Sequence, residues 1–100
     1  MALYWGTDTG ERPGQTMHRL ANRLRLVRVG QHAAVRTMLR AMDGETRGST
    51  NLTGEEAGIL AGALRRAAAR MWWSPGFAQL TRILANDADR AARAGTWVID

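Results

Sequence analysis

Cysteine and lysine are both absent from this 100-residue chain. Without cysteine there is no disulfide framework, no thiolate metal ligand and no cysteine nucleophile. No apolar run approaches the roughly 20 residues that span a bilayer. The opening residues, MALYWGTDTG, lack the basic start and apolar core of a secretory signal. These absences predict a cytoplasmic protein with no membrane partner.

The absence of lysine leaves arginine as the only strongly basic residue. Fourteen arginines give the chain a net charge of +5 and a pI near 11.4. A chain this basic indicates an anionic partner. A GC-rich coding sequence would produce the same composition, because arginine and alanine codons are GC-rich and lysine codons are not. We give coding bias the larger weight and keep the anionic partner as the alternative.

Apolar residues recur at spacings of three and four along most of the chain, which is typical of amphipathic helices. Met17, Leu20 and Leu24 form the first such stripe, and Gly30 follows as a natural stop. The predicted helices span 15–29, 31–43, 54–73 and 75–94, after an extended segment and loop over 1–14. The predicted fold is all-α: a single domain over 1–100, a small four-helix bundle with short extended aromatic N- and C-terminal segments.

Local signals refine the second half of the chain. Thr53 and Glu56 have the spacing of a capping box, which predicts a helix start. Gly58 and Gly62 predict the close approach of a neighbouring helix. Asp87 falls on the apolar face of the last helix, so we expect it to be buried beside a partner, an arginine such as Arg28.

The second half also carries a resemblance. LTGEEAGILAGALRRAAARMWW is followed by FAQLTRILANDADRAARAGTW. A threonine-capped helix start, an alanine-rich helix and DRAARAG before a tryptophan resemble a group of uncharacterised small helical proteins of high-GC Gram-positive bacteria and their phages. The resemblance covers residues 52–97. It implies a helical fold and supplies no activity, cofactor or site residue.

The residues suited to catalysis do not combine into a reaction centre. His18 and His32 lie near the ends of different predicted helices, with no carboxylate at helical spacing. Glu55 and Glu56 are explained by the first turn of a helix, where the dipole favours acidic side chains. A zinc site would need three or four protein ligands. We predict that the protein is not an enzyme and has no catalytic, cofactor or metal-binding residue.

Nucleic-acid binding is the alternative function. Arg19, Arg23, Arg36 and Arg40, on the first two predicted helices, are the candidate phosphate contacts. A helix-turn-helix is disfavoured, because the glycine of its turn comes too late, at Gly30. Acidic residues interspersed through the sequence also weigh against this function.

Protein–protein interaction is the first hypothesis. Trp72 and Trp73 would point about 100° apart on a helix, so one of them should be partly exposed. The predicted interface consists of Trp72, Trp73, Ile59 and Arg70, and its partner is another protein or a second copy of the chain. We expect most of the six aromatic residues to form one cluster at an end of the bundle. The chain would then serve as a small regulatory, inhibitory or phage accessory protein.

Overall fold

A computed structural model describes residues 2–5, 10–44 and 50–99, with side chains described for 16–44 and 50–97. Over these residues the chain is mostly helical. The helices are α1 (Gly14–Leu26), α2 (Ala33–Met42), α3 (Gly54–Ala69) and α4 (Pro75–Ala94), and the strands are β1 (Ala2–Trp5), β2 (Gly10–Pro13), β3 (Thr50–Thr53) and β4 (Thr96–Ile99).

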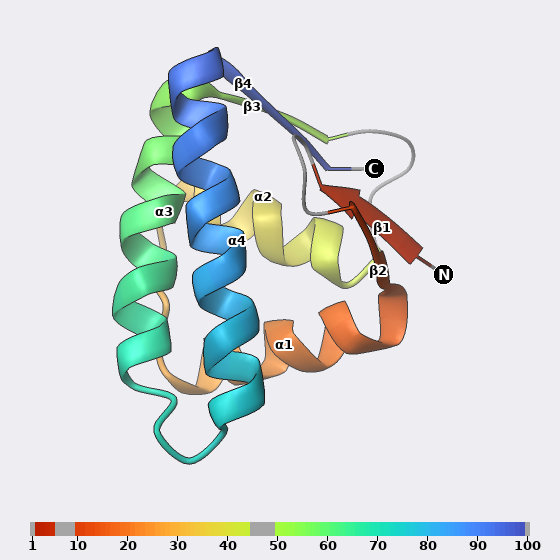
Figure 1. Ribbon diagram of the computed structural model, residues 1–100, viewed down its shortest axis with the longest axis vertical. Helices are drawn as coiled ribbons and strands as arrows, with labels where there is room; N and C mark the ends of the chain where they lie inside the picture. Colours follow the sequence, from red (N-terminus) through yellow and green to blue (C-terminus); the bar gives the residue numbers. More distant parts are fainter. Residues whose placement is uncertain (1, 6–9, 45–49, 100) are drawn as a thin grey trace.

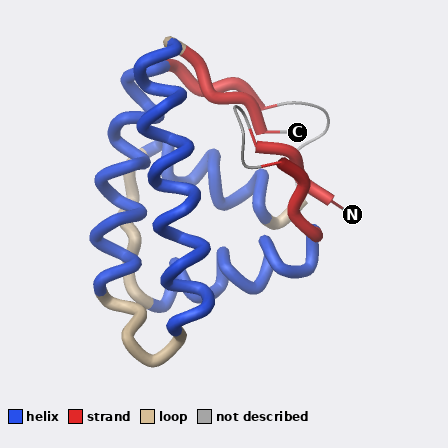
Figure 2. The backbone as a smooth tube through the Cα atoms, viewed as in Figure 1, coloured by secondary structure: helices blue, strands red, loops and turns tan. Residues whose placement is uncertain are grey.

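The helices form two pairs. In Figure 1, α3 and α4 run antiparallel as a long hairpin, and the shorter α1 and α2 lie across its side. β3 and β4 run from one end of the hairpin toward β1 and β2, which lie on the side away from the hairpin, and the turn between α3 and α4 lies at the other end (Figure 2). The core between the two helix pairs contains Met17, Leu24, Met38, Leu60 and Leu64, none of which is exposed.

The predicted all-α fold is wrong, because the extended segments form an antiparallel sheet in the order β2-β1-β4-β3. Two ladders, β1 with β2 and β3 with β4, meet at the pair Trp5↔Ile99. An extended segment must find partners for its backbone N–H and C=O groups, and here the segments supply them to one another. Four-residue strands are too short to show an alternating pattern, which is why helical periodicity alone missed them.

Three helices end earlier or begin later than predicted. The helix expected over 15–29 stops at Leu26, that over 31–43 spans Ala33–Met42, and that over 54–73 stops at Ala69. The residues that the helices lack relative to the prediction lie in the turns between them. His32 accepts a hydrogen bond from the backbone N–H of Ala34 and so caps α2. The helix expected over 75–94 is α4, Pro75–Ala94.

The start of α3 is pressed against the end of α4. The N–H of Gly54 donates to the carbonyl of Gly95 at 2.9 Å, and a Cβ at Gly54 would lie 2.9 Å from the carbonyl oxygen of Ala92. The predicted capping box of Thr53 and Glu56 is present beside this contact. At Gly58 an added Cβ would make only ordinary contact, at 3.9 Å, so the close approach falls one turn earlier than predicted.

Asp87 is fully buried and has an arginine partner, as predicted, but that arginine is Arg90 rather than Arg28. The indole N–H of Trp97 donates to its Oδ2 at 2.7 Å, and Arg90 approaches its Oδ1 at 3.4 Å. Arg28 lies at the opposite end of the hairpin, beside Arg70. Trp97, itself fully buried, thus fastens β4 to α4. It also stands apart from Trp72 and Trp73, so the expected single aromatic cluster does not form among the described side chains.

Candidate interaction surface

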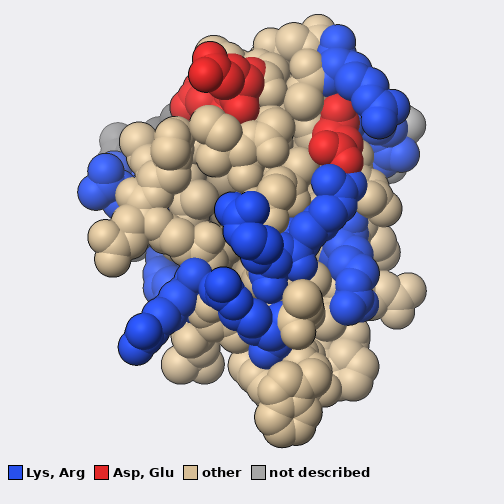
Figure 3. Space-filling view, turned by 90° about the vertical axis from the view of Figure 1, so that its left-hand side faces the viewer, with Lys and Arg blue, Asp and Glu red and all other residues tan. Residues whose placement is uncertain are grey.

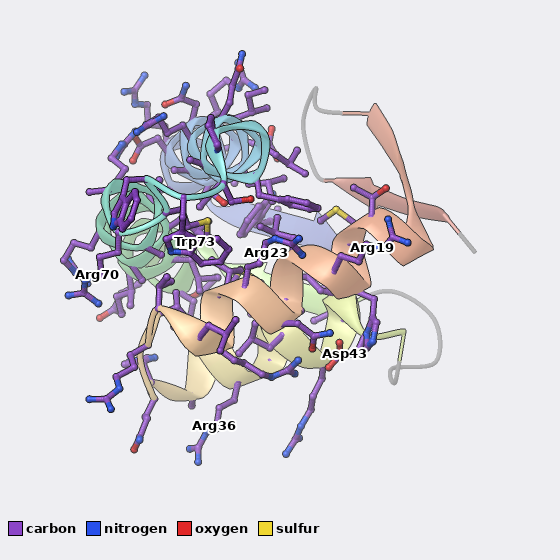
Figure 4. All side chains as sticks on the ribbon, turned by 90° about the horizontal axis from the view of Figure 1, so that it is seen from below. Arg19, Arg23, Arg36, Asp43, Arg70 and Trp73 are labelled. Atoms are coloured by element: carbon purple, nitrogen blue, oxygen red, sulfur yellow. The ribbon has the colours of Figure 1, made fainter. Side chains whose placement is uncertain are left out.

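Large apolar side chains reach solvent at the end of the molecule away from the sheet. Among the described side chains, Trp72 is 83% exposed, Leu26 73% and Trp73 44%, whereas Ile83, on α4, is 36% exposed. Figure 4 views this end and shows Trp73 between the α3–α4 turn and α1. Three apolar side chains therefore stand exposed where the hairpin turns and α1 ends.

The turn between α3 and α4 places the two tryptophans outside. After Ala69 the backbone tightens, because the N–H groups of Arg70 and Met71 bond to carbonyls three residues back. Met71 then enters the core and is fully buried. Ser74 precedes Pro75, a position that disfavours helical backbone. Trp72 and Trp73 occupy the resulting turn, so their exposure follows from the turn rather than from helical geometry.

Arg70 ties this turn to the end of α1. Its Nη1 donates to the carbonyls of Val27 and Arg28, at 3.0 and 3.2 Å. These carbonyls lack helical partners because α1 has ended, so the guanidinium satisfies them. We call the surface formed by Leu26, Arg70, Trp72 and Trp73 the tryptophan end. Arg70, predicted as an interface residue, thus also holds this surface together.

Ile59, the remaining predicted interface residue, is not part of the tryptophan end. It is only partly exposed, and it precedes Arg70 by eleven residues on α3. At 1.5 Å of rise per residue, that is a separation of about 16 Å along the helix. The structure therefore brings together Arg70, Trp72 and Trp73, and adds Leu26, which sequence reasoning missed. The sequence did hold a signal for it, because position 26 lies on the opposite side of the helix from the stripe of Met17, Leu20 and Leu24.

The four arginines predicted as phosphate contacts do not form one surface. In Figure 4, Arg19 and Arg23 lie on the side of α1 that faces the hairpin, and Arg36 points away on the opposite side. Arg40 is exposed one helical turn beyond Arg36. Arg23 is half-buried: its guanidinium lies 4.1 Å from the ring centroid of Phe77 and donates to the carbonyl of Arg19.

Charge is segregated along the molecule, which the sequence interpretation overlooked. Residues 12–42 contain seven arginines and 57–86 contain four, and neither stretch contains an acidic residue. The described carboxylates belong instead to the C-cap of α2, the first turn of α3 and the second half of α4. On the face shown in Figure 3 the acidic side chains lie in the upper half, and the tryptophan end is at the bottom.

Asp43 joins α1 to the end of α2. It accepts hydrogen bonds from Arg25 and lies 2.8 Å from Nδ1 of His18. Burial alone would raise the pKa of Asp43, but the hydrogen bonds and charges of Arg25 and His18 outweigh it and hold the pKa below 3.8. Sequence spacing could not reveal this pair, because His18 and Asp43 are 25 residues apart.

A pocket of about 350 Å³ opens where α1 passes into α2. We call it the junction pocket; its lining residues are Arg25, Arg28, Val29, Gly30, Gln31 and Leu39. Val29 and Leu39 give it apolar walls, and the two arginines and Gln31 give it polar edges. It adjoins the tryptophan end, because Arg70 donates to the carbonyl of the lining residue Arg28.

The fold and these surfaces define a small, mostly helical domain with a short sheet and one basic, apolar end. Residues 6–100 match the family described as Domain of unknown function (DUF7739), and the chain belongs to that family. Comparison with the curated proteins and with the solved structures gave no significant match. Within the described part of the chain, no helix has the length and apolar character needed to cross a membrane.

Proposed function

We propose that this domain is a non-enzymatic protein-interaction module that binds its partner through the tryptophan end. The observation that carries the proposal is the exposure of Leu26, Trp72 and Trp73 together at one end of the fold. Covering apolar surface gains about 25 cal/mol per Å², and both tryptophan and arginine are enriched at interface hot spots. The partner is another protein or a second copy of this chain.

The setting of the interaction is part of the same proposal. A chain whose fourteen basic residues include no lysine fits a high-GC bacterial or phage origin. We propose that it acts in the cytoplasm as a small regulatory, inhibitory or phage accessory protein. In each of these roles the chain works by covering a surface of its partner, and it needs no cofactor or catalytic residue.

Site-specific photo-cross-linking in the producing cell tests the proposal. A photoreactive residue replaces Trp72 in one variant and Glu55, which is exposed near the sheet, in the control. We expect one discrete protein adduct from position 72 and none from position 55. An adduct with the chain's own mass would identify the partner as a second copy. Equal labelling from both positions, or adducts with nucleic acid alone, would contradict the proposal.

Nucleic-acid binding is a second candidate, and the absence of acidic residues from 12–42 favours it. Phosphate contacts require placed positive charge and bind less tightly as salt rises. The test is the fluorescence anisotropy of a labelled random-sequence duplex at low and at physiological salt. Salt-sensitive binding that is lost when Arg36 and Arg40 become alanine, but kept when Arg90 and Arg93 do, would support it. No binding at low salt would exclude it.

A further inference from the structure

The backbone that leads out of α1 has an unusual residue at its turning point. Arg28 has φ 55°, the only positive φ outside glycine among the described residues. Its N–H bonds to the carbonyl of Arg25 and that of Val29 bonds to Leu24, which is the hydrogen-bond pattern of a Schellman helix end. Glycine is the usual residue at this position, because a side chain is strained there. Arginine at this position calls for an explanation.

The fold uses the backbone of Arg28 and leaves its guanidinium exposed. The carbonyl accepts a hydrogen bond from Arg70, and Val29 turns into the core, 7% exposed. The side chain lines the junction pocket. Strained residues persist where the surroundings fix them, and they concentrate at binding sites. The structure therefore holds a cation at the edge of a pocket, at a position where the fold alone would favour glycine.

The residues around the guanidinium of Arg28 indicate which kind of ligand would bind there. Arg25, the other guanidinium of the pocket, is already paired with Asp43, so Arg28 supplies the main attraction for a new anion. Val29 and Leu39 offer an apolar wall, and exposed Leu26 follows the lining residue Arg25 in the chain. A planar guanidinium pairs with a carboxylate through two parallel hydrogen bonds. An acidic group attached to an apolar one matches this arrangement.

We propose that the junction pocket binds an acidic peptide segment of the protein partner, with a carboxylate on Arg28 and a neighbouring apolar side chain against Val29 and Leu39. This inference rests on the proposed function and names the part of the partner that is recognised. Charge complementarity argues for it, since residues 12–42 contain no acidic residue and Asp43, which follows them, is already paired with Arg25 and His18. The rest of the segment covers Leu26 and reaches the tryptophan end.

Selection from a random peptide library displayed on phage, against the full chain, tests the recognition directly. We expect enriched peptides to share an aspartate or glutamate next to a large apolar residue. Synthetic copies should bind the Arg28→Gly variant at least about tenfold more weakly, since a charged hydrogen-bonded pair is lost. Arg93→Gly, which removes an exposed arginine near the sheet, should leave the affinity unchanged.

The Arg28→Gly variant separates recognition from folding, because glycine suits the backbone at this position. Its circular dichroism and melting temperature should equal or exceed those of the parent chain. Peptides without acidic residues, no enriched peptides, or equal affinity for Arg28→Gly would overturn the inference. Retention on phosphatidylserine vesicles without peptide binding would overturn it too, in favour of a lipid surface. A single cross-linked protein at position 72 that lacks an acidic segment would refute this inference and leave the proposed function standing.

Discussion

Tryptophan is buried at one end of the α3–α4 hairpin and exposed at the other. At the sheet, Trp97 is fully buried and its indole N–H donates to the buried carboxylate of Asp87. At the turn, Trp72 is 83% exposed, and the surrounding stretch 57–86 contains no acidic residue. One tryptophan therefore stabilises the fold, whereas the other adds apolar surface that the described fold leaves uncovered. Position in the fold, rather than residue type, assigns the role.

The sharpest test of this comparison removes each tryptophan in turn. Trp97→Ala should lower the free energy of unfolding by about 3–5 kcal/mol, because it leaves a large cavity and an unpaired buried carboxylate. Trp72→Ala should change it by less than about 0.5 kcal/mol, as is usual for exposed side chains. Urea denaturation followed by circular dichroism measures both. A large loss from Trp72→Ala would make that residue structural and weaken the proposed function.

A second pair of substitutions compares two carboxylates on α4. Asp87→Ala should cost about 2 kcal/mol, because it strands the N–H of Trp97 inside the protein. Asp89→Ala, two residues further on, removes an ion pair with Arg65 at the surface and should cost less than about 0.5 kcal/mol. The same denaturation experiment serves here. Equal losses would show that the contact between Asp87 and Trp97 is not what fastens β4 to α4.

A third test uses pH, since Asp43 links α1 to α2 away from both tryptophans. Its pKa in the folded protein is held below 3.8, so its contribution is present above that pH and is lost as the pH falls further. Asp43→Asn should lower stability by about 1 kcal/mol at neutral pH and flatten the dependence of stability on pH below 3.8. Melting curves recorded across the acid range measure this. Parallel curves for the two proteins would contradict it.

The smallest expected effect concerns Arg28. Arg28→Gly should raise the free energy of unfolding by about 0.5–1 kcal/mol, because relief of the left-handed backbone outweighs the added freedom of the unfolded chain. Arg36→Gly, in the interior of α2, is the matched control and should lower stability by about 1 kcal/mol. A loss of stability in Arg28→Gly would show that the arginine side chain supports the fold.

Part of this structure could be predicted from the sequence. The periodic stripes place all four helices of the described chain, and Thr53 with Glu56 places the start of α3 correctly. The strands could not be found this way, because each has four residues, and the pairs of β4 with β1 and with β3 join segments distant in the sequence. The end of α1 at Leu26 could not be predicted either, since its Schellman turn has Arg28 at the position where glycine is the usual signal.

The candidate site was predicted only in outline. Trp72, Trp73 and Arg70 do lie together, because they are neighbours in the chain. The contact of Arg70 with Val27 spans 43 residues, so local patterns could not show that α1 contributes Leu26 to the same surface. The charge segregation could have been predicted from the sequence, since two stretches of about 30 residues contain no acidic residue.

The contact between Gly54 and Gly95 has a consequence for how α3 and α4 are aligned along each other. The buried faces of α3 and α4 contain many alanines, among them Ala57, Ala61 and Ala88. Alanine offers nearly the same surface at every turn, so such faces could slide past each other by one turn with little change in packing. A slide of one turn would break the hydrogen bond from the free first-turn N–H of Gly54 to the carbonyl of Gly95, and Gly58, one turn further on, has its N–H inside the helix. This contact thereby sets the alignment of the two helices, and with it how far the tryptophan turn stands from the sheet.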